Sequence, residues 1–303
     1  MELRQLRHFV AVVEAGNLSV AASKTYLSQP ALSRSIKNLE TTLGVQLLER
    51  KARGVVPTEA GERLYTEAMF ILSECGRVHE DMAAIESGQD SSVHLGIAPM
   101  FGAYVVDNAV GELRRNAPGI ALRVTEVLYP ELVDGVMKGT FDVAFTNFPF
   151  GNVPKGLSTE TIYEVTSILA VGAQHPLARK RAVVPADFAG ARWAILSHGH
   201  VSTVIEQFMM ANGLPPPTDV VATNSLLLIR SLILNEGFIS MMPAEVFGRE
   251  AAAGTVKSLK VSTGPLHRPA GLLYRTRAQT RKSVEIVKDA LRAACRRAKL
   301  ALP

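Results

Sequence analysis

The sequence predicts an α+β protein of several domains: a small helical unit with a two-stranded wing, a long connecting helix, and a larger region of two α/β lobes. Three observations predict this. Residues 1–58 combine amphipathic helices with a basic hairpin, residues 59–86 carry a heptad repeat of apolar residues, and beyond residue 92 strand-like and helix-like segments alternate. The chain of 303 residues is long enough for a small domain and a larger one with its own core.

The N-terminal segment predicts helices that pack on one another as a helix-turn-helix. Ala21 and Ala22 are small enough for a neighbouring helix to cross closely. The next helix begins after Ser28, whose hydroxyl can cap it, and it ends at Gly44. Two apolar stripes would form the core: Leu3, Leu6, Phe9, Val10 and Val13 on the first helix, and Leu32, Ile36, Leu39 and Leu43 on the later one.

The polar edge of this later helix is suited to a DNA groove. Its side chains can give bidentate hydrogen bonds to base edges and cationic contacts to phosphates. An isolated polar helix face is more often simply solvated, but here the surrounding helices and a wing favour the DNA interpretation. The residues concerned are Gln29, Ser33, Arg34, Lys37 and Asn38.

The segment VQLLERKARGVVPT predicts the wing, as two short strands around a basic turn. Arg50, Lys51 and Arg53 lie at its tip, and Gly54 allows the chain to reverse. An arginine in this place can reach a minor groove.

Four motifs together resemble the LysR-type transcriptional regulators: MELRQLRHFVAVVEAGNLSVAA, SQPALSRSIKNLE, LGVQLLER and PTEAG. The resemblance runs the whole length of the chain. By position, it implies that Gln29, Pro30, Ser33 and Arg34 face the major groove and that Arg53 lies near the minor groove. It also implies tetramers, frequent autorepression, activation of a neighbouring operon, and a C-terminal region similar to periplasmic solute-binding proteins.

Residues 59–91 are expected to form a dimerisation helix followed by a hinge at the SGQDSS stretch. Thr58 can cap the helix, and apolar residues are spaced alternately by four and three: Leu64, Ala68, Ile71, Cys75, Val78, Met82 and Ile85. An amphipathic helix packed on its own domain is the alternative. A dimer would present two recognition helices to one face of the duplex, so we expect an imperfect palindrome as the target.

Residues 92–303 predict two lobes with crossing strands between them. We expect lobe I to comprise residues 92–161 and 266–303, and lobe II residues 162–265. A small effector would bind in the cleft between them. In such folds the ends of the strands face the cleft, so we expect the residues that follow them to line it. These are Pro99, Met100, Phe101, Leu128, Tyr129, Thr146 and Asn147 from lobe I, with Ser197, His198, His200, Ser202, Asn224 and Ser225 from lobe II.

The cleft residues depart from those of relatives that sense aromatic carboxylates. Met100 stands where a small hydroxyl residue is common, Tyr129 where threonine or serine is usual, and Asn147 where some members carry arginine. These departures favour an aromatic or neutral polar effector over a simple carboxylate.

Metal and thiol chemistry are not expected. His198 and His200 share one loop, but a zinc site needs a third ligand and no such spacing is present. The chain has two cysteines, Cys75 and Cys295, both on apolar helix faces, which is typical of small buried hydrophobes. We therefore expect no metal, no cofactor and no thiol-based oxidant switch.

Hydropathy and the two cysteines indicate a cytoplasmic protein without a membrane partner. No signal peptide or spanning helix is predicted. The strongest basic cluster is C-terminal, where residues 275–303 hold nine Lys or Arg against two Asp or Glu. A solvated helix face explains it best, and an auxiliary contact to DNA or RNA polymerase is the alternative.

Two other functions compete with that of an effector-responsive transcription factor. An enzyme is disfavoured because no GxSxG, GxxxxGK[ST], GxGxxG or zinc motif is present. An architectural DNA-binding protein without an effector would not need two lobes and a cleft.

Overall fold

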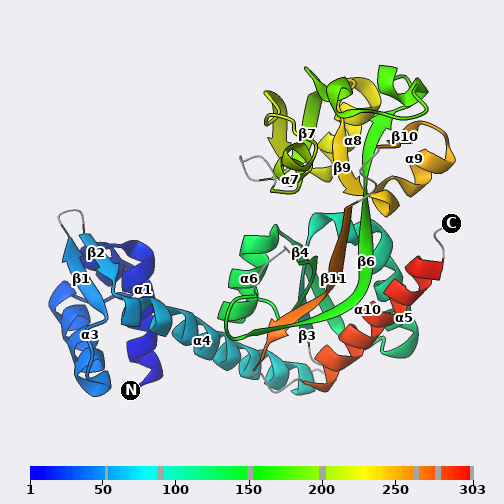
Figure 1. The fold of residues 1–303 in the computed structure, drawn as a ribbon. Helices are drawn as coiled ribbons and strands as arrows, with labels where there is room; N and C mark the ends of the chain where they lie inside the picture. Colours follow the sequence, from blue (N-terminus) through cyan, green and yellow to red (C-terminus); the bar gives the residue numbers. More distant parts are fainter. Residues whose placement is uncertain are drawn as a thin grey trace.

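The computed structural model describes residues 1–51, 54–86, 92–148, 153–197, 203–261, 266–276 and 281–300. An N-terminal head, the long helix α4 (Glu59–Glu86) and a two-lobed body follow one another along the chain, as Figure 1 shows. The head lies at the end of α4 that is remote from most of the body. This arrangement confirms the predicted fold class.

The head is a winged helix-turn-helix made of α1 (Leu3–Ala15), α2 (Leu18–Lys24), α3 (Gln29–Leu43), β1 (Leu48–Lys51) and β2 (Gly54–Pro57). Its core includes side chains that are at most 1% exposed, among them Leu6, Phe9, Val12, Leu32, Leu39 and Leu47. The predicted apolar stripes are thus confirmed along most of their length. They are wrong at the ends, where Leu3 and Leu43 are exposed because the neighbouring helices do not reach them.

Local capping sets the bounds of α3 as the sequence predicts. The Ser28 hydroxyl accepts a hydrogen bond from the Ala31 backbone N–H, and Pro30 occupies the first turn, where no donor is needed. Gly44 ends the helix in the left-handed conformation with φ 71°.

The wing is held against the helices by a close backbone contact. The Val55 N–H donates to the Gly16 carbonyl at 2.8 Å. Next to it, Gly54 has φ 134°, and a Cβ built there would lie 2.2 Å from the same carbonyl oxygen. Glycine is therefore needed at this position for two independent reasons, its dihedral angle and the lack of space.

Lobe I contains β3 (Ser92–Ile97), η1 (Pro99–Phe101), η2 (Gly102–Val106), α5 (Asp107–Asn116), β4 (Ala121–Glu126), α6 (Tyr129–Lys138), β5 (Val143–Asn147) and α10 (Lys282–Leu300). Lobe II contains η3 (Pro176–Arg179), η4 (Pro185–Phe188), β7 (Arg192–Leu196), α7 (Thr203–Ala211), β8 (Asp219–Thr223), α8 (Leu226–Asn235), β9 (Ser240–Pro243), η5 (Ala244–Phe247), α9 (Gly248–Ala252) and β10 (Val256–Leu259). Two long strands join the lobes, β6 (Leu157–Gly172) and β11 (Leu266–Arg275).

The main sheet runs in the order β10-β6-β11-β5-β3-β4, and β9 also pairs with β6. β3 lies parallel to β4 and β5, whereas β11 lies antiparallel to β5 and β6. β6 pairs with β11 from Leu157 to Ser167 and with β9 from Ser167 onward. Ser167 is therefore the residue at which β6 exchanges its partners in lobe I for those in lobe II.

Each lobe has its own apolar core. Phe101 and Phe145 are buried in lobe I, and Trp193 and Phe247 are buried in lobe II. Met100 packs against both cores, so it lies where the lobes meet.

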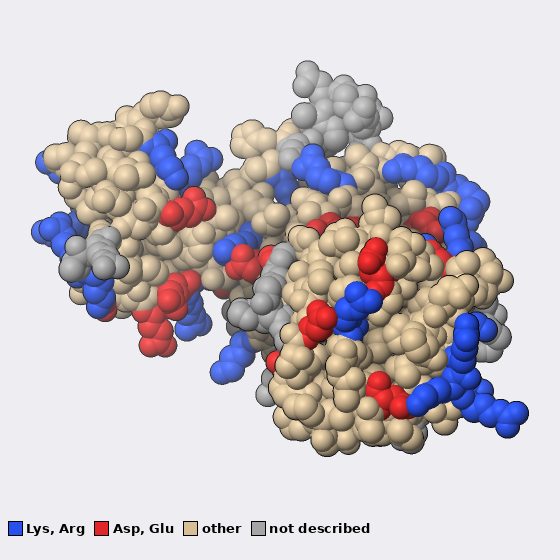
Figure 2. Space-filling model, turned by 90° about the horizontal axis from the view of Figure 1, so that it is seen from above, with Lys and Arg blue, Asp and Glu red and all other residues tan. Residues whose placement is uncertain are grey.

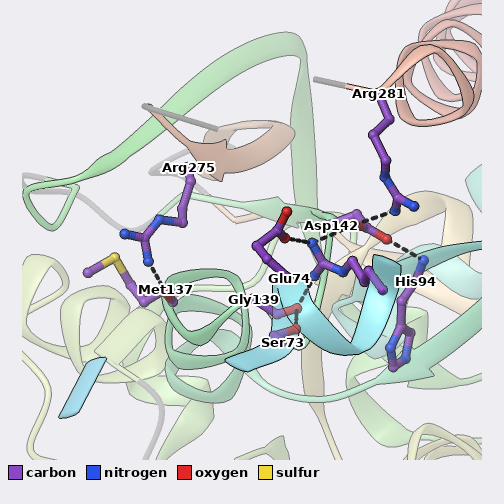
Figure 3. Close-up of polar contacts among 9 residues, drawn as sticks. Ser73, Glu74, His94, Met137, Gly139, Asp142, Arg275 and Arg281 are labelled. Atoms are coloured by element: carbon purple, nitrogen blue, oxygen red, sulfur yellow. Dashed lines mark hydrogen bonds and ion pairs between the residues drawn. The ribbon is translucent and has the colours of Figure 1, made fainter. Parts of the chain in front are cut away.

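Helix α4 is fastened to lobe I through one carbonyl and one carboxylate, seen in Figure 3. The Ser73 hydroxyl donates to the Gly139 carbonyl at 2.7 Å, and the Arg77 guanidinium donates to the same oxygen. Arg77 also pairs with Asp142 at 3.1 Å, and Arg281, just before α10, pairs with that carboxylate at 2.8 Å. Because the Asp142 side chain is only 5% exposed, water contributes little to its neutralisation.

A second set of contacts lies one to two turns earlier on α4. Arg275 at the end of β11 donates to the Met137 carbonyl, as Figure 3 shows. It also pairs with Glu67 at 2.8 Å and lies 3.9 Å from the centre of the Phe70 ring. A Cβ on Gly139 would lie 2.9 Å from Phe70. Helix α4 therefore contacts lobe I at two places along its length, and these contacts fix its orientation relative to lobe I.

Removing the buried carboxylate should weaken this junction strongly. We expect Asp142→Ala to lower the free energy of unfolding by roughly 3 kcal/mol, because Arg77 and Arg281 would lose their shared partner. The matched control is Asp134→Ala, which breaks an exposed pair with Lys138 on α6 and should cost less than about 1 kcal/mol. Urea unfolding of both variants measures the difference, and equal losses would contradict the role given to Asp142.

Candidate functional site

The predicted DNA-reading residues lie together on the free face of α3. Gln29, Pro30, Arg34, Lys37 and Asn38 are exposed, and Ser33 is half-buried between them. The opposite face of α3 is buried in the head, as the apolar stripe requires. Figure 2 shows further Lys and Arg side chains over the head at the left of the view. This exposed helix face can approach a polyanion without rearrangement of the head.

Two hydrogen bonds hold α3 in position before any DNA is bound. The Ser19 hydroxyl of α2 donates to the Gln29 side-chain oxygen at 3.0 Å, which fixes the amide at the start of α3. The His8 ring and the Ser35 hydroxyl are 2.8 Å apart and join α1 to α3. Burial, with a smaller contribution from Arg4, lowers the pKa of His8, so this imidazole is neutral at pH 7.

Tyr26 is a surface residue that sequence reasoning missed. It lies in the turn before α3, has φ 56°, and is 96% exposed. A left-handed conformation is uncommon for an aromatic residue, and a large exposed ring next to a recognition helix is equally unusual. The position in the turn of a helix-turn-helix was the signal in the sequence that could have nominated it.

The wing is described in part. Arg50 is exposed on β1, while Lys51 pairs with Glu49 at 2.7 Å. Arg53 lies outside the described residues, so its predicted place near the minor groove stays a prediction.

The predicted heptad seam on α4 is divided between two environments. Ala68 is fully buried in the core of the head, and Leu64 and Ile71 pack against the same core. The prediction that Ala68 faces a partner subunit is therefore wrong, because the head's own helices cover that face of α4. Further along, Cys75 is half-buried, Val78 is 58% exposed and Met82 is 57% exposed. The side chain of Ile85 lies outside the described residues.

The predicted cleft residues of lobe I are not equally placed. Phe101 does not line a cleft, because its ring is buried in the lobe I core and meets Phe145 edge-on at 5.0 Å. Thr146 is also buried, and its hydroxyl donates to the Asn147 carbonyl. Pro99 is buried as well. Met100, Leu128, Tyr129 and Asn147 are partly exposed.

In lobe II, Ser197 is half-buried at the end of β7 and Asn224 is exposed after β8. The Ser225 hydroxyl caps α8 by accepting from the Leu228 N–H. His198, His200 and Ser202 lie outside the described residues, so their predicted roles remain predictions.

Several buried polar groups between the lobes were missed by sequence reasoning. The Tyr104 hydroxyl of η2 lies 3.1 Å from the Tyr163 hydroxyl of β6, and burial raises the pKa of both. Burial also raises the pKa of Glu245, whose Oε2 has no hydrogen-bond partner. On the crossing strands, Arg268 Nε and Ser167 Oγ are likewise buried without partners.

A cavity of about 330 Å³ opens beside Ser167 in lobe II. Its walls are mainly apolar, with Ser167, Thr166, Ser258 and Lys260 as the polar members and Leu169, Phe208, Met241 and Leu259 among the apolar ones. An apolar cavity with a few polar groups is typical of a small-molecule site.

The two thiols are free and differently placed. Cys295 on α10 is buried in the lobe I core, and burial raises its pKa to about 12. Cys75 is half-buried on α4. At pH 7 the Cys295 thiol is thus almost wholly protonated, which makes it a poor nucleophile.

Several basic side chains of α10 make their contacts within lobe I. Arg292 pairs with Glu160 at 2.7 Å, Arg297 pairs with Glu112 at 2.7 Å, and Lys288 is buried over the Tyr274 ring at 4.0 Å. These contacts favour a structural interpretation of the C-terminal cluster over a contact to another macromolecule.

The described residues offer neither a metal centre nor a membrane-spanning helix. They contain no group of three or more His, Cys, Asp or Glu side chains placed to hold a metal ion. None of their helices combines the length and hydropathy that crossing a bilayer requires.

Two family models match the chain. Residues 3–62 match the model described as "Bacterial regulatory helix-turn-helix protein, lysR family", and residues 86–296 match "LysR substrate binding domain". The second match assigns a ligand-binding domain to the two lobes, which removes the architectural alternative.

Individual proteins agree with both models. A "Hydrogen peroxide-inducible genes activator" of Escherichia coli O6:H1 is 29% identical over 301 residues, which is 97% of this chain and 95% of that protein. Full-length OxyR from Pseudomonas aeruginosa, in a cysteine-to-aspartate variant, has a TM-score of 0.62 at 22% identity and covers 96% of this chain and 95% of that one. CbnR in complex with its target DNA has a TM-score of 0.61 at 24% identity and covers 97% of this chain and all of that one.

The chain therefore belongs to the LysR family: it is a DNA-binding transcriptional regulator with a small-molecule effector domain, and it is not an enzyme.

Proposed function

We propose that this regulator reads an imperfect palindrome by placing one α3 helix of a dimer in each half-site. The observation that carries the proposal is the exposed face of α3, on which Gln29, Ser33 and Arg34 stand together at the leading edge. Arg34 has a fork of donors suited to a guanine edge, whereas Lys37 and Asn38 lie further along, where phosphates would pass. Tyr26 extends this surface from the preceding turn.

We propose that the protein acts in the cytoplasm. We also propose that its domains divide at residues 58 and 91. Lobe II would join lobe I near Ser167, a few residues later than the division at 161–162 expected from sequence, because β6 changes its partners there.

We propose further that lobe I, α4 and the head move together while lobe II moves relative to them. The supporting observations are the Asp142 and Arg275 contacts, which hold α4 on lobe I, and the two strands that carry the connection to lobe II. An effector that prefers one lobe closure would shift that equilibrium. Closure would change how dimers pair into a tetramer, and hence the spacing of the heads on DNA.

Replacing Arg34 should reduce sequence discrimination. We expect Arg34→Ala to lose roughly 1–3 kcal/mol on the target site and much less on scrambled DNA. Lys37→Ala is the matched control, because loss of a phosphate contact weakens binding to both duplexes alike and makes the salt dependence shallower. Fluorescence anisotropy on DNA from upstream of its own gene, at fixed salt, gives both affinities. An unchanged ratio in Arg34→Ala would remove this residue from the base-reading set.

A charge on the exposed half of α4 should weaken the dimer. We propose that Val78 and Met82 supply the partner contact, since they are exposed apolar residues on the heptad face. Met82→Glu should raise the dimer dissociation constant by at least about 100-fold, because an unpaired carboxylate would be buried. Gly76→Glu adds the same charge away from the seam, where a side chain meets nothing within 4 Å, and should leave the dimer intact. Analytical ultracentrifugation distinguishes the two, and an unaffected Met82→Glu dimer would count against this seam.

We propose that the signal is not peroxide, although relatives are named hydrogen peroxide-inducible genes activators. The supporting observations are the buried, protonated Cys295 and the lack of a second cysteine near either thiol in the sequence.

Excess hydrogen peroxide should therefore leave the affinity for target DNA unchanged. Mass spectrometry should find Cys295 reduced after the treatment. A peroxide-induced change in affinity that disappears in Cys75→Ser would show that a thiol does act as the sensor.

A further inference from the structure

A polar pocket of about 250 Å³ lies where α4 joins lobe I. Five parts of the chain form it: α4, the beginning of β3, the first half of β4, the turn between α6 and β5, and the residue before α10. Several of its lining residues are seen together in Figure 3: Ser73, His94, Gly139, Asp142 and Arg281. The pocket is therefore built at the same junction that fastens α4 to lobe I.

This pocket is separate from the effector site proposed between the lobes. β3 and β4 are parallel, and the pocket lies beside residues 92–94, where β3 begins. The lobes meet beyond the other end of β3, where Met100 packs against both cores. Ligands of open α/β sheets usually bind at the carboxyl ends of the strands, so a pocket at the amino ends has a different role.

Positive charge is in excess in the pocket. Arg77, Arg123 and Arg281 line it, against the single carboxylate of Asp142 among the lining residues that the structure describes. Arg77 also pairs with Glu74, but that side chain is 47% exposed and is largely solvated. The lining residues therefore carry two more positive charges than negative ones.

Arg123 is a cation of this pocket that no carboxylate neutralises. It is exposed on β4, and no hydrogen bond or ion pair joins it to another residue in the described part of the chain. Its partner in the strand register is His94 on β3. Burial lowers the pKa of His94, and the charge of Arg123 lowers it further. The pocket therefore has a positive potential that a bound anion would offset.

A tetrahedral oxyanion suits this arrangement better than a carboxylate does. The three guanidiniums come from α4, β4 and the start of α10, so donors reach the pocket from different sides. The oxygens of phosphate or sulfate point in four directions, whereas a carboxylate presents two oxygens in one plane. A dianion also balances two excess positive charges. Because a water molecule occupies about 30 Å³ in the liquid, the pocket has room for a five-atom oxyanion and several waters.

We propose that a phosphate or sulfate group binds in this pocket and strengthens the attachment of α4 to lobe I. The oxyanion accepts hydrogen bonds from Arg123 on β4 and from Arg77 on α4. Arg77 has donors left for it, because a guanidinium has five N–H groups and its present acceptors are Glu74, Asp142 and the Gly139 carbonyl. This ligand acts on the junction that carries the DNA-binding head, and the inference is independent of the proposed lobe closure.

The first test is calorimetric titration of the full-length protein, without DNA, with inorganic phosphate at constant ionic strength. Arg123→Gln should weaken phosphate binding roughly 10-fold, as expected for loss of a charged hydrogen bond. Arg181→Gln removes an exposed arginine of lobe II and is the matched control, which should bind as the native protein does. No saturable binding to the native protein, or equal affinity in Arg123→Gln, would overturn the proposal.

A second variant closes the pocket without removing an arginine. Gly76→Glu places a carboxylate at the pocket wall, and a Cβ at this position meets nothing within 4 Å, so α4 can accommodate it. Phosphate and sulfate stabilise most proteins because they are excluded from the surface. The melting temperature should therefore rise more with phosphate in the native protein than in Gly76→Glu, and an equal rise in both would contradict a specific site.

Hydrogen exchange tests the effect on the junction. Phosphate should slow amide exchange at residues 73–77 of α4 in the native protein and in Arg181→Gln, but much less in Arg123→Gln. Exchange that stays the same while phosphate is bound would show that the oxyanion does not strengthen the attachment of α4.

The source of the oxyanion is distinguished by a parallel titration with phenyl phosphate. Binding at least as tight as that of inorganic phosphate would support the phosphate group of a metabolite as the ligand. Binding of inorganic phosphate alone would support the free ion. Failure of both to bind would overturn the oxyanion site, and it would leave the proposed DNA recognition and lobe closure unaffected.

Discussion

The antiparallel pairing of β6 with β11 is the constraint on which the body of this regulator depends. These strands belong to both lobes, so their register decides which residues lie between the lobes and which face solvent. A slip of one residue would move every side chain to the other face. Arg268 and Ser167 would then face outward, and His267 and Thr166 would face inward. Backbone pairing therefore decides which side chains of these strands lie between the lobes.

The contact between α4 and lobe I extends this constraint to the DNA-binding head. Asp142 is buried between two arginines that come from distant parts of the chain, Arg77 on α4 and Arg281 before α10. A buried carboxylate with two cations is satisfied in one arrangement of these segments and unsatisfied in others. Within the described part of the chain, no ion pair fastens lobe II to α4, which makes lobe II the part that can move at lower cost.

Features that depend on neighbouring residues were predictable, and those that depend on distant ones were not. Ser28 caps α3 and Gly44 ends it because each acts on atoms a few residues away. Ala68 was misassigned because its helical spacing is the same whether α4 packs on a partner or on the head. Phe101 was misassigned because a strand end marks the edge of a sheet but does not tell whether a ring turns into the cleft or into the core. The buried Nε of Arg268 was overlooked because an arginine on a strand is exposed in most sequences.

The sequence by itself determined the family, the winged helix-turn-helix with its reading face, the long helix, and the absence of catalytic motifs, because these are written in short motifs and local periodicities. Tertiary structure decided which half of α4 remains free for a partner, how α4 is fastened to lobe I, and which polar groups are buried between the lobes. Those outcomes depend on contacts between residues far apart in the chain, such as Arg77 with Asp142 and Ser167 with the strand that carries Arg268. A buried polar atom without a hydrogen-bond partner can be identified once these contacts are known, because the local sequence does not determine them.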